Sequence, residues 1–82
     1  MEKKEYIITV FSENEIGVLN RITAVFLRRK INIESLKVTE SSIKGISMFV
    51  ITLYARREQL EKIIGHIERI VEVLDASFYD VD

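Results

Sequence analysis

The stretch ISMFVITLY, residues 46–54, decides how this sequence folds. Val, Ile, Phe, Thr and Tyr dominate it, and residues with branched or aromatic side chains favour extended strands. It directly follows Gly45, and glycine readily adopts the positive φ that tight turns require. Residues 31–43, before that glycine, alternate loosely between apolar and polar side chains. We therefore predict a β-hairpin in which residues 31–43 pair with residues 46–54 around a turn at residues 41–45.

A strand and a helix are predicted before the hairpin. Residues 5–12, EYIITVFS, have strand composition and end in a polar loop. Residues 16–30 have the helical period, with one face formed by Leu19, Ile22, Thr23 and Phe26 and the other by Asn20, Arg21 and Arg28. The helix ends in three cations, Arg28 to Lys30, which oppose the negative end of the helix dipole. We interpret these cations as a solvated helix terminus.

A second helix and a closing strand are predicted after the hairpin. Residues 56–71 return to the helical period, and residues 71–79 alternate again. The predicted apolar stripe of the helix consists of Leu60, Ile63, Ile64, Ile67, Ile70 and Val71. Its predicted outer face consists of Glu61, Lys62, Glu68, Arg69 and Glu72. The order β-α-β-β-α-β predicts an α+β, ferredoxin-like fold, a four-stranded antiparallel sheet with two helices on one face. We predict a single domain over residues 1–82.

The sheet is expected to need a partner. A chain of 82 residues buries a thin core, and this one has no Cys and a single His with which to reinforce it. Both sides of the predicted strands carry apolar groups, such as Ile8 and Val10 against Ile7 and Phe11. A sheet with one face in water alternates more cleanly. We therefore expect self-association, and a cover over the helix-free face.

Charge and composition narrow the functional classes. The net charge is −1 with both signs interspersed, so neither nucleic acid nor a membrane surface is an expected partner. No apolar run approaches the ~20 residues of a membrane span, and Met1 to Glu5 lead into a strand pattern, so we expect a cytoplasmic protein. Glu13 and Glu15 have no nucleophile or base beside them, and His66 at the edge of the helix stripe has no metal-ligand partners. We predict no catalytic residue, metal or cofactor.

The loop before the first helix is the best candidate binding site. It reads Asn14-Glu15-Ile16-Gly17-Val18-Leu19. Unpaired backbone N–H groups and the positive end of the helix dipole accept a carboxylate there. Gly17 would let a ligand approach the backbone closely, and Asn14 offers both an acceptor and a donor. The same residues are also ordinary choices for capping a helix.

A family resemblance favours the binding interpretation. Residues 13–23, the cations Arg28 and Arg29, and above all Asn32-Ile33-Glu34-Ser35-Leu36 resemble the ACT domain of the regulatory, small subunit of acetohydroxyacid synthase, also called acetolactate synthase. The resemblance covers nearly the whole chain. Position 16 is Ile, where many ACT domains have Pro before the glycine.

The resemblance implies a homodimer, formed by side-by-side pairing of two sheets through the first helix and second strand, with effector sites at the seam. A feedback amino acid, valine or else leucine or isoleucine, would contact the backbone at Ile16, Gly17 and Val18. Asn14 would bind it too, Leu19 and Ile33 could line the hollow, and Asn32 with Ile33 would come from the partner chain. The implied role is non-catalytic regulation of the acetolactate synthase catalytic subunit, which would hold thiamine diphosphate, Mg and FAD.

Three alternatives stay open. The chain could be a stand-alone ACT amino-acid sensor for another enzyme or a transcription factor, or a module that only assembles. A ferredoxin-like RNA-binding module would use exposed aromatics such as Phe11 and Phe49, but no Lys/Arg-Gly-Phe run accompanies them.

Overall fold

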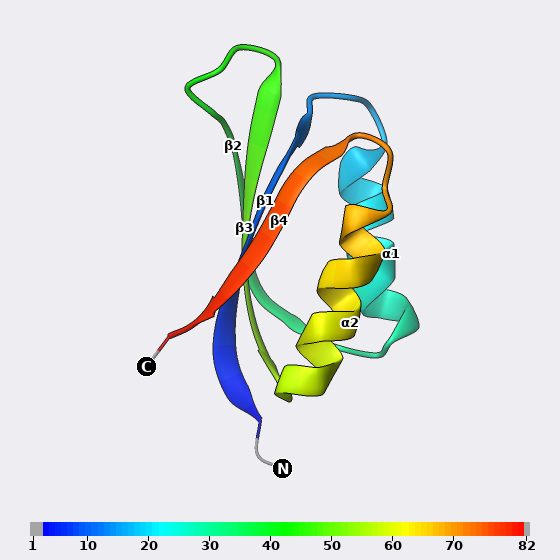
Figure 1. Cartoon of the computed structure of the whole chain (residues 1–82), viewed down its shortest axis with the longest axis vertical. Coiled ribbons are helices and arrows are strands. Elements are labelled where there is room, and N and C mark those ends of the chain that lie inside the picture. Colours follow the sequence, from blue (N-terminus) through cyan, green and yellow to red (C-terminus); the bar gives the residue numbers. More distant parts are fainter. Residues whose placement is uncertain (1–2, 82) are drawn as a thin grey trace.

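The computed structural model describes residues 3–81, and Met1, Glu2 and Asp82 of the predicted domain lie outside these described residues. The elements, in chain order, are β1 (Lys4–Glu13), α1 (Val18–Arg28), β2 (Ile33–Glu40), β3 (Ile46–Ala55), α2 (Arg57–Glu68) and β4 (Val73–Asp80). Both helices lie on one side of a twisted sheet (Figure 1). The predicted element order and fold class are confirmed.

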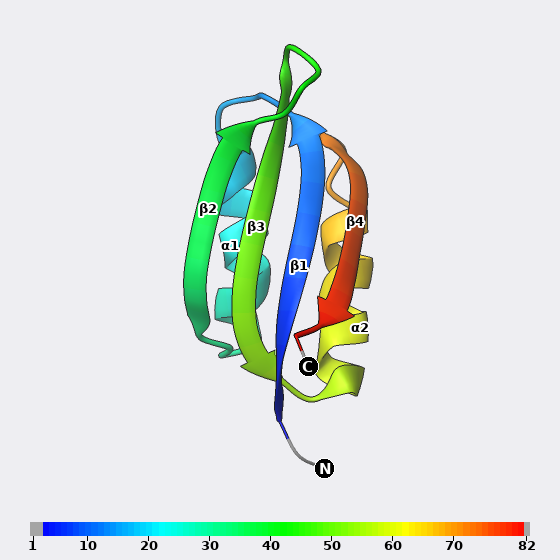
Figure 2. The same cartoon turned by 90° about the vertical axis from the view of Figure 1, so that its left-hand side faces the viewer.

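The sheet has the strand order β2-β3-β1-β4, and every neighbouring pair is antiparallel. The two central strands, β1 and β3, were the most strongly β-forming stretches of the sequence. Viewed from the helix-free side, the four strands stand in front of the two helices (Figure 2). β2 and β4 are therefore the edges, and each leaves one row of backbone groups unpaired within the sheet.

Alternation along the strands builds the core. The even-numbered residues of β1, Tyr6, Ile8 and Val10, are buried under the helices. In β3, Phe49 and Ile51 are buried in the same layer, opposite Val10 and Ile8 in the register. Each such side chain contributes roughly 1.5–3 kcal/mol when fully buried. This layer is what holds the two helices against the sheet.

The buried face of α1 differs from the predicted one. Val18, Ile22, Val25 and Phe26 are buried, whereas Leu19 is 41% exposed and Thr23 is only partly buried. The predicted and observed stripes share Ile22 and Phe26, and both fit a helical period. The packing of the helix on the sheet buries Val18 and Val25 instead of Leu19 and Thr23, and the helix begins at Val18 because residues 16 and 17 are a turn.

The second helix keeps its predicted core but ends earlier. Leu60, Ile63 and Ile67 are fully buried, as predicted. The helix stops at Glu68 instead of residue 71, which leaves Val71 87% exposed in the following turn. Glu72 belongs to the same turn, and its side chain is only 19% exposed, contrary to the predicted outward orientation. Its backbone oxygen accepts a hydrogen bond from the Glu13 N–H, which holds it against β1.

The turn of the hairpin lies where the sequence predicts it. Ser41 N–H donates to Ile46 O at 2.8 Å, and Gly45 has φ 87°. On the helix-free face, Ile7, Phe11, Met48 and Val50 are only half-buried. That a partner covers this face stays a prediction. None of the helices in residues 3–81 is long and apolar enough to cross a membrane.

Candidate functional site

A shallow groove runs between α1 and the start of β2. It has a volume of about 360 Å³ and is lined mainly by apolar or small side chains, namely Asn20, Thr23, Ala24, Phe26, Leu27, Ile31, Asn32 and Ile33. Two residues of the predicted effector site, Asn32 and Ile33, belong to this lining. Thr23 donates its hydroxyl to the Leu19 carbonyl oxygen at 3.0 Å, so this hydroxyl is already bonded within α1. The groove thus offers an apolar wall with two amide side chains, those of Asn20 and Asn32.

The loop between β1 and α1 presents unpaired backbone donors. Gly17 is the N-cap of α1 in a left-handed conformation, with φ 92° and ψ −11°, and no side chain caps the helix. Among residues 3–81, the Ile16 and Gly17 N–H groups have no hydrogen-bond acceptor. The sequence predicts such donors at this position. They lie at the positive end of the α1 dipole, which favours a carboxylate.

The predicted loop residues differ in what they can offer a ligand. Asn14 is anchored by its backbone, whose N–H donates to Gly45 O at 2.9 Å, while its exposed side chain bonds to none of the described residues. Ile16 is fully exposed, at 101% of its reference area. Val18 is 2% exposed, so only its backbone could meet a ligand.

The two halves of the predicted site lie apart within one chain. The β1–α1 loop is at one end of α1, and Asn32 and Ile33 follow its other end (Figure 1). The 11 residues of α1 correspond to about 16 Å at 1.5 Å per residue. A single copy therefore does not bring Asn14 and Asn32 around one small molecule, and a second copy would have to supply one of them.

An ion pair that the sequence did not predict lies beside the β1–α1 loop. Arg21 Nη2 lies 2.6 Å from Glu72 Oε2, and a Cβ added to Gly17 would sit 3.5 Å from Arg21 Nη1. The other carboxylate oxygen of Glu72, Oε1, is buried and has no hydrogen-bond partner among the described residues. Residues 21 and 72 lie far apart in the sequence, so no local motif could have paired them.

Comparison with known proteins places this arrangement in a family. The family model described as "AHAS small subunit-like ACT domain" matches residues 8–75, which include both halves of the candidate site. The chain belongs to this family. Among the described residues of this ACT domain, no three acidic or histidine side chains gather as metal ligands would.

Relatives of this ACT domain are acetolactate synthase small subunits. That of Aquifex aeolicus is 35% identical over 74 residues, which are 90% of this chain and 38% of the relative. The probable acetolactate synthase small subunit of Methanothermobacter thermautotrophicus is 34% identical over 90% of this chain and 44% of its own length. The chain thus spans less than half of these relatives.

Comparison with solved structures agrees with this family and fold. The Thermotoga maritima acetolactate synthase small subunit superposes with a TM-score of 0.85 at 29% identity, covering 95% of this chain and 48% of that one. The ACT domain of a GTP pyrophosphokinase from Chlorobium tepidum superposes with a TM-score of 0.79 over 94% of this chain and 99% of its own. Its 17% identity shows the shared fold alone.

Proposed function

We propose that this ACT domain is a regulatory part of acetolactate synthase that binds a feedback amino acid, valine or else leucine or isoleucine, between two copies of the chain. The observation that carries the proposal is the separation of the two half-sites by the length of α1. Each end offers polar groups suited to an amino acid, and neither end encloses one. A twofold axis beside α1 would bring the loop of one copy to Asn32 of the other.

The edge formed by α1 and β2 has the surface such pairing needs. Leu27 on α1 is 78% exposed. Leu36 and Val38 are 37% and 45% exposed, although their register opposite Ile51 and Phe49 directs them to the helix side of the sheet. β2 is an edge strand, and edge strands readily pair with another chain. Pairing there would join two sheets into one eight-stranded sheet and cover these side chains.

The chemistry of the half-sites matches a zwitterion with an aliphatic side chain. The free Ile16 and Gly17 N–H groups would bind the carboxylate, and the Asn14 side-chain oxygen would accept from the ammonium group. The partner's copy of Asn32 would add a second amide, and the apolar wall of the groove, with Ile33, would hold the aliphatic part. Leu19, at 41% exposure, lies one residue into α1 and can complete that wall.

The chain itself does no chemistry in this proposal. The catalytic subunit would hold thiamine diphosphate, Mg and FAD, and this domain would change the activity of that subunit. Such control requires the amino acid to bind one arrangement of the complex more tightly than another, because a ligand with equal affinity for both shifts nothing. A coupling free energy of about 1–3 kcal/mol is ordinary for such control.

A mixing experiment tests both the ligand and its position between chains. Asn14→Ala and Asn32→Ala are each expected to lose most valine binding in isothermal titration calorimetry. When the two variants are mixed and allowed to exchange chains, half of the dimers pair one variant with the other. One of the two sites in each such dimer contains both asparagines, so about a quarter of the sites should recover wild-type affinity.

The control is Ser77→Ala, an exposed polar position on β4, the edge strand farthest from β2 in the sheet and outside the groove. It should leave the valine affinity within a factor of about two, roughly 0.4 kcal/mol. Failure of wild type to bind any of the three amino acids would refute the sensing role. If mixing recovers no sites, the two asparagines do not meet in one site between chains. They would then belong to separate sites or to a site within one chain.

A further inference from the structure

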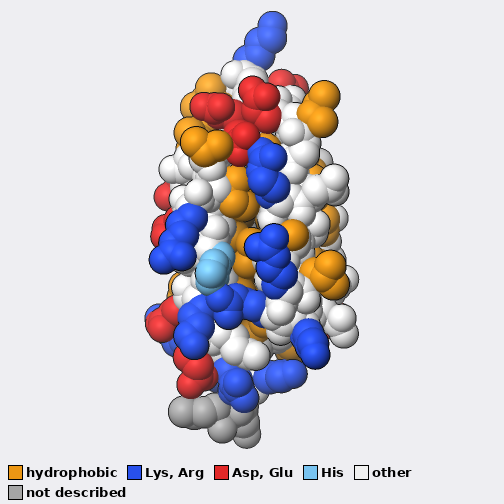
Figure 3. Space-filling model, turned by 90° about the vertical axis from the view of Figure 1, so that its right-hand side faces the viewer, with side chains coloured by type: hydrophobic (Ala, Val, Ile, Leu, Met, Phe, Trp, Pro, Cys, Tyr) orange, Lys and Arg blue, Asp and Glu red, His pale blue; other side chains and the backbone are white. Residues whose placement is uncertain are grey.

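The outer face of the two helices carries a cationic patch that the proposed amino-acid site does not use. It consists of Arg28 and Arg29 at the end of α1, Lys62 and His66 on α2, and Arg69 at the C-terminal cap of α2. The last three residues are four and three positions apart and Arg69 keeps a helical conformation, so they share one side of the helix. Figure 3 shows this face, where Lys and Arg side chains gather around the histidine.

The positive charges of this patch are not neutralised by the rest of the domain. Within residues 3–81, no ion pair involves Arg28, Arg29, Lys62 or Arg69. Two acidic residues of α2 are paired with other arginines. Glu58 lies 3.7 Å from Arg56, and Glu61 lies 3.4 Å from Arg57. The cations of the patch are therefore left to repel one another across the gap between the helices.

The pKa of His66 reflects this repulsion. His66 Nε2 contacts Arg29 Nη2, and because an arginine can only donate, a hydrogen bond there requires Nε2 to be the acceptor. Desolvation by the surrounding side chains lowers the pKa of His66, and the charges of Arg29, Arg69 and Arg28 lower it further. The charged groups that act on the ring come from both helices, and all of them are positive.

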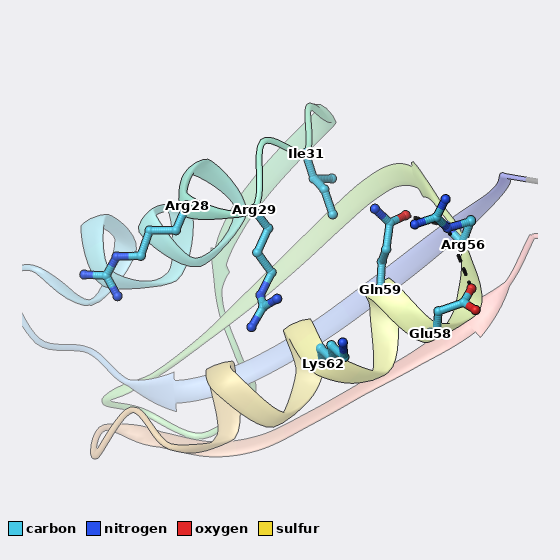
Figure 4. Close-up of a pocket in the computed structure, with 7 residues that line it drawn as sticks. All are labelled: Arg28, Arg29, Ile31, Arg56, Glu58, Gln59 and Lys62. Carbon is cyan, nitrogen blue, oxygen red and sulfur yellow. Dashed lines mark hydrogen bonds and ion pairs between the residues drawn. The ribbon is translucent and has the colours of Figure 1, made fainter.

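The patch surrounds two hollows that share two arginines. One, of about 270 Å³, is lined by Arg28, Arg29, Ile31, Arg56, Glu58, Gln59 and Lys62. The other, of about 280 Å³, is lined by Val25, Arg28, Arg29 and His66. Figure 4 shows Arg29 extending from α1 toward α2, where Lys62 lies. The residues from Lys62 to Arg69 alone extend about 10 Å along α2.

We propose that this patch is a docking surface for a short acidic segment of another protein. Carboxylates spaced along such a segment would reach cations from both helices at the two hollows, and the one acidic residue in their lining, Glu58, is paired with Arg56. The length of the patch exceeds what one phosphate needs. A nucleic acid or a membrane would extend beyond the patch and its hollows onto Glu61 and Glu68 of α2, on a domain whose net charge is −1. Those negative borders favour a ligand of limited length.

The test uses a fluorescein-labelled peptide of consecutive glutamates and the full chain, with binding followed by fluorescence anisotropy at low ionic strength. Wild type should bind the peptide, and binding should weaken as salt is added. The double variant Lys62→Glu/Arg69→Glu should bind it about tenfold more weakly, or ~1.4 kcal/mol. Both positions are exposed, so the fold should persist, which circular dichroism checks.

The matched control is Lys37→Glu/Lys44→Glu, which changes the net charge equally but lies on the helix-free face of β2 and in the hairpin turn. It should bind the peptide within about twofold of wild type. Equal losses in the two double variants would overturn the proposal, because net charge alone would then explain binding. So would an absence of peptide binding to wild type. Two results would assign the patch to another ligand. One is a labelled oligonucleotide of equal charge that binds as tightly as the peptide. The other is inorganic phosphate that displaces the peptide more strongly than sodium chloride does at the same ionic strength.

Discussion

Replacing Gly17 by Ala should destabilise the domain through its backbone alone. Gly17 has φ 92°, a conformation that costs a residue with a Cβ roughly 1–2 kcal/mol. The added Cβ would meet only Arg21 Nη1, at 3.5 Å, which is an ordinary contact. Because alanine also restricts the unfolded chain, part of the strain is offset. The expected loss in the free energy of unfolding is about 1 kcal/mol, or about 4–8 °C in Tm for a domain of this size.

Two other glycines provide controls for the same substitution. Gly45 has φ 87° and no neighbour within 4 Å of the place a Cβ would take, so Gly45→Ala should cost about as much as Gly17→Ala. Gly65 lies inside α2, has no positive φ and also has open space, so Gly65→Ala should stabilise by up to ~1 kcal/mol. Urea denaturation at one fixed protein concentration measures all three. A Gly17→Ala variant as stable as wild type, or a Gly65→Ala variant less stable than wild type, would refute the reasoning.

Three further outcomes are expected. Leu27→Asp should shift the chain from dimer to monomer in light scattering, whereas Leu74→Asp, at another exposed position on the opposite edge strand, should not. Glu72→Gln should lower the free energy of unfolding by about 1 kcal/mol through its lost pair with Arg21, and a double-mutant cycle with Arg21→Met should show the coupling. Because the folded state lowers the pKa of His66 below 6.5, the unfolded chain binds that proton more tightly, so stability should fall as the pH drops from 6.5 toward the folded pKa. His66→Gln should remove that part of the pH dependence.

Local patterns predicted the elements, and the errors arose where the chain departs from a regular period. The strands and the hairpin turn at Gly45 were predictable because composition and one glycine determine them. The buried face of α1 was not, because two overlapping apolar stripes fit the helical period, one with Leu19 and the other with Val18 and Val25. Only the packing of the helix on the sheet selects between them.

The sequence alone could not predict contacts between segments that are far apart in the chain. The cations at Arg28 and Arg29 were interpreted as a solvated helix end from their position on α1 alone. Only the antiparallel packing of α2 beside α1 brings Lys62 and His66 next to them and makes a patch. The Arg21–Glu72 pair is the same kind of contact, since it exists only because β4 returns beside β1.

The two proposed ligands would meet at one short segment. Arg28 and Arg29 belong to the cationic patch, Asn32 and Ile33 to the amino-acid site, and Ile31 lines a hollow of each. Lys30 between them has φ 57°, an uncommon conformation for a residue with a side chain. An acidic segment bound to Arg28 and Arg29 would therefore shift the backbone that positions Asn32. Linkage requires that any factor by which valine changes the affinity for the glutamate peptide equals the factor by which the peptide changes the affinity for valine. Peptide titrations with and without valine measure that factor. A factor of one would mean that the two sites bind their ligands independently.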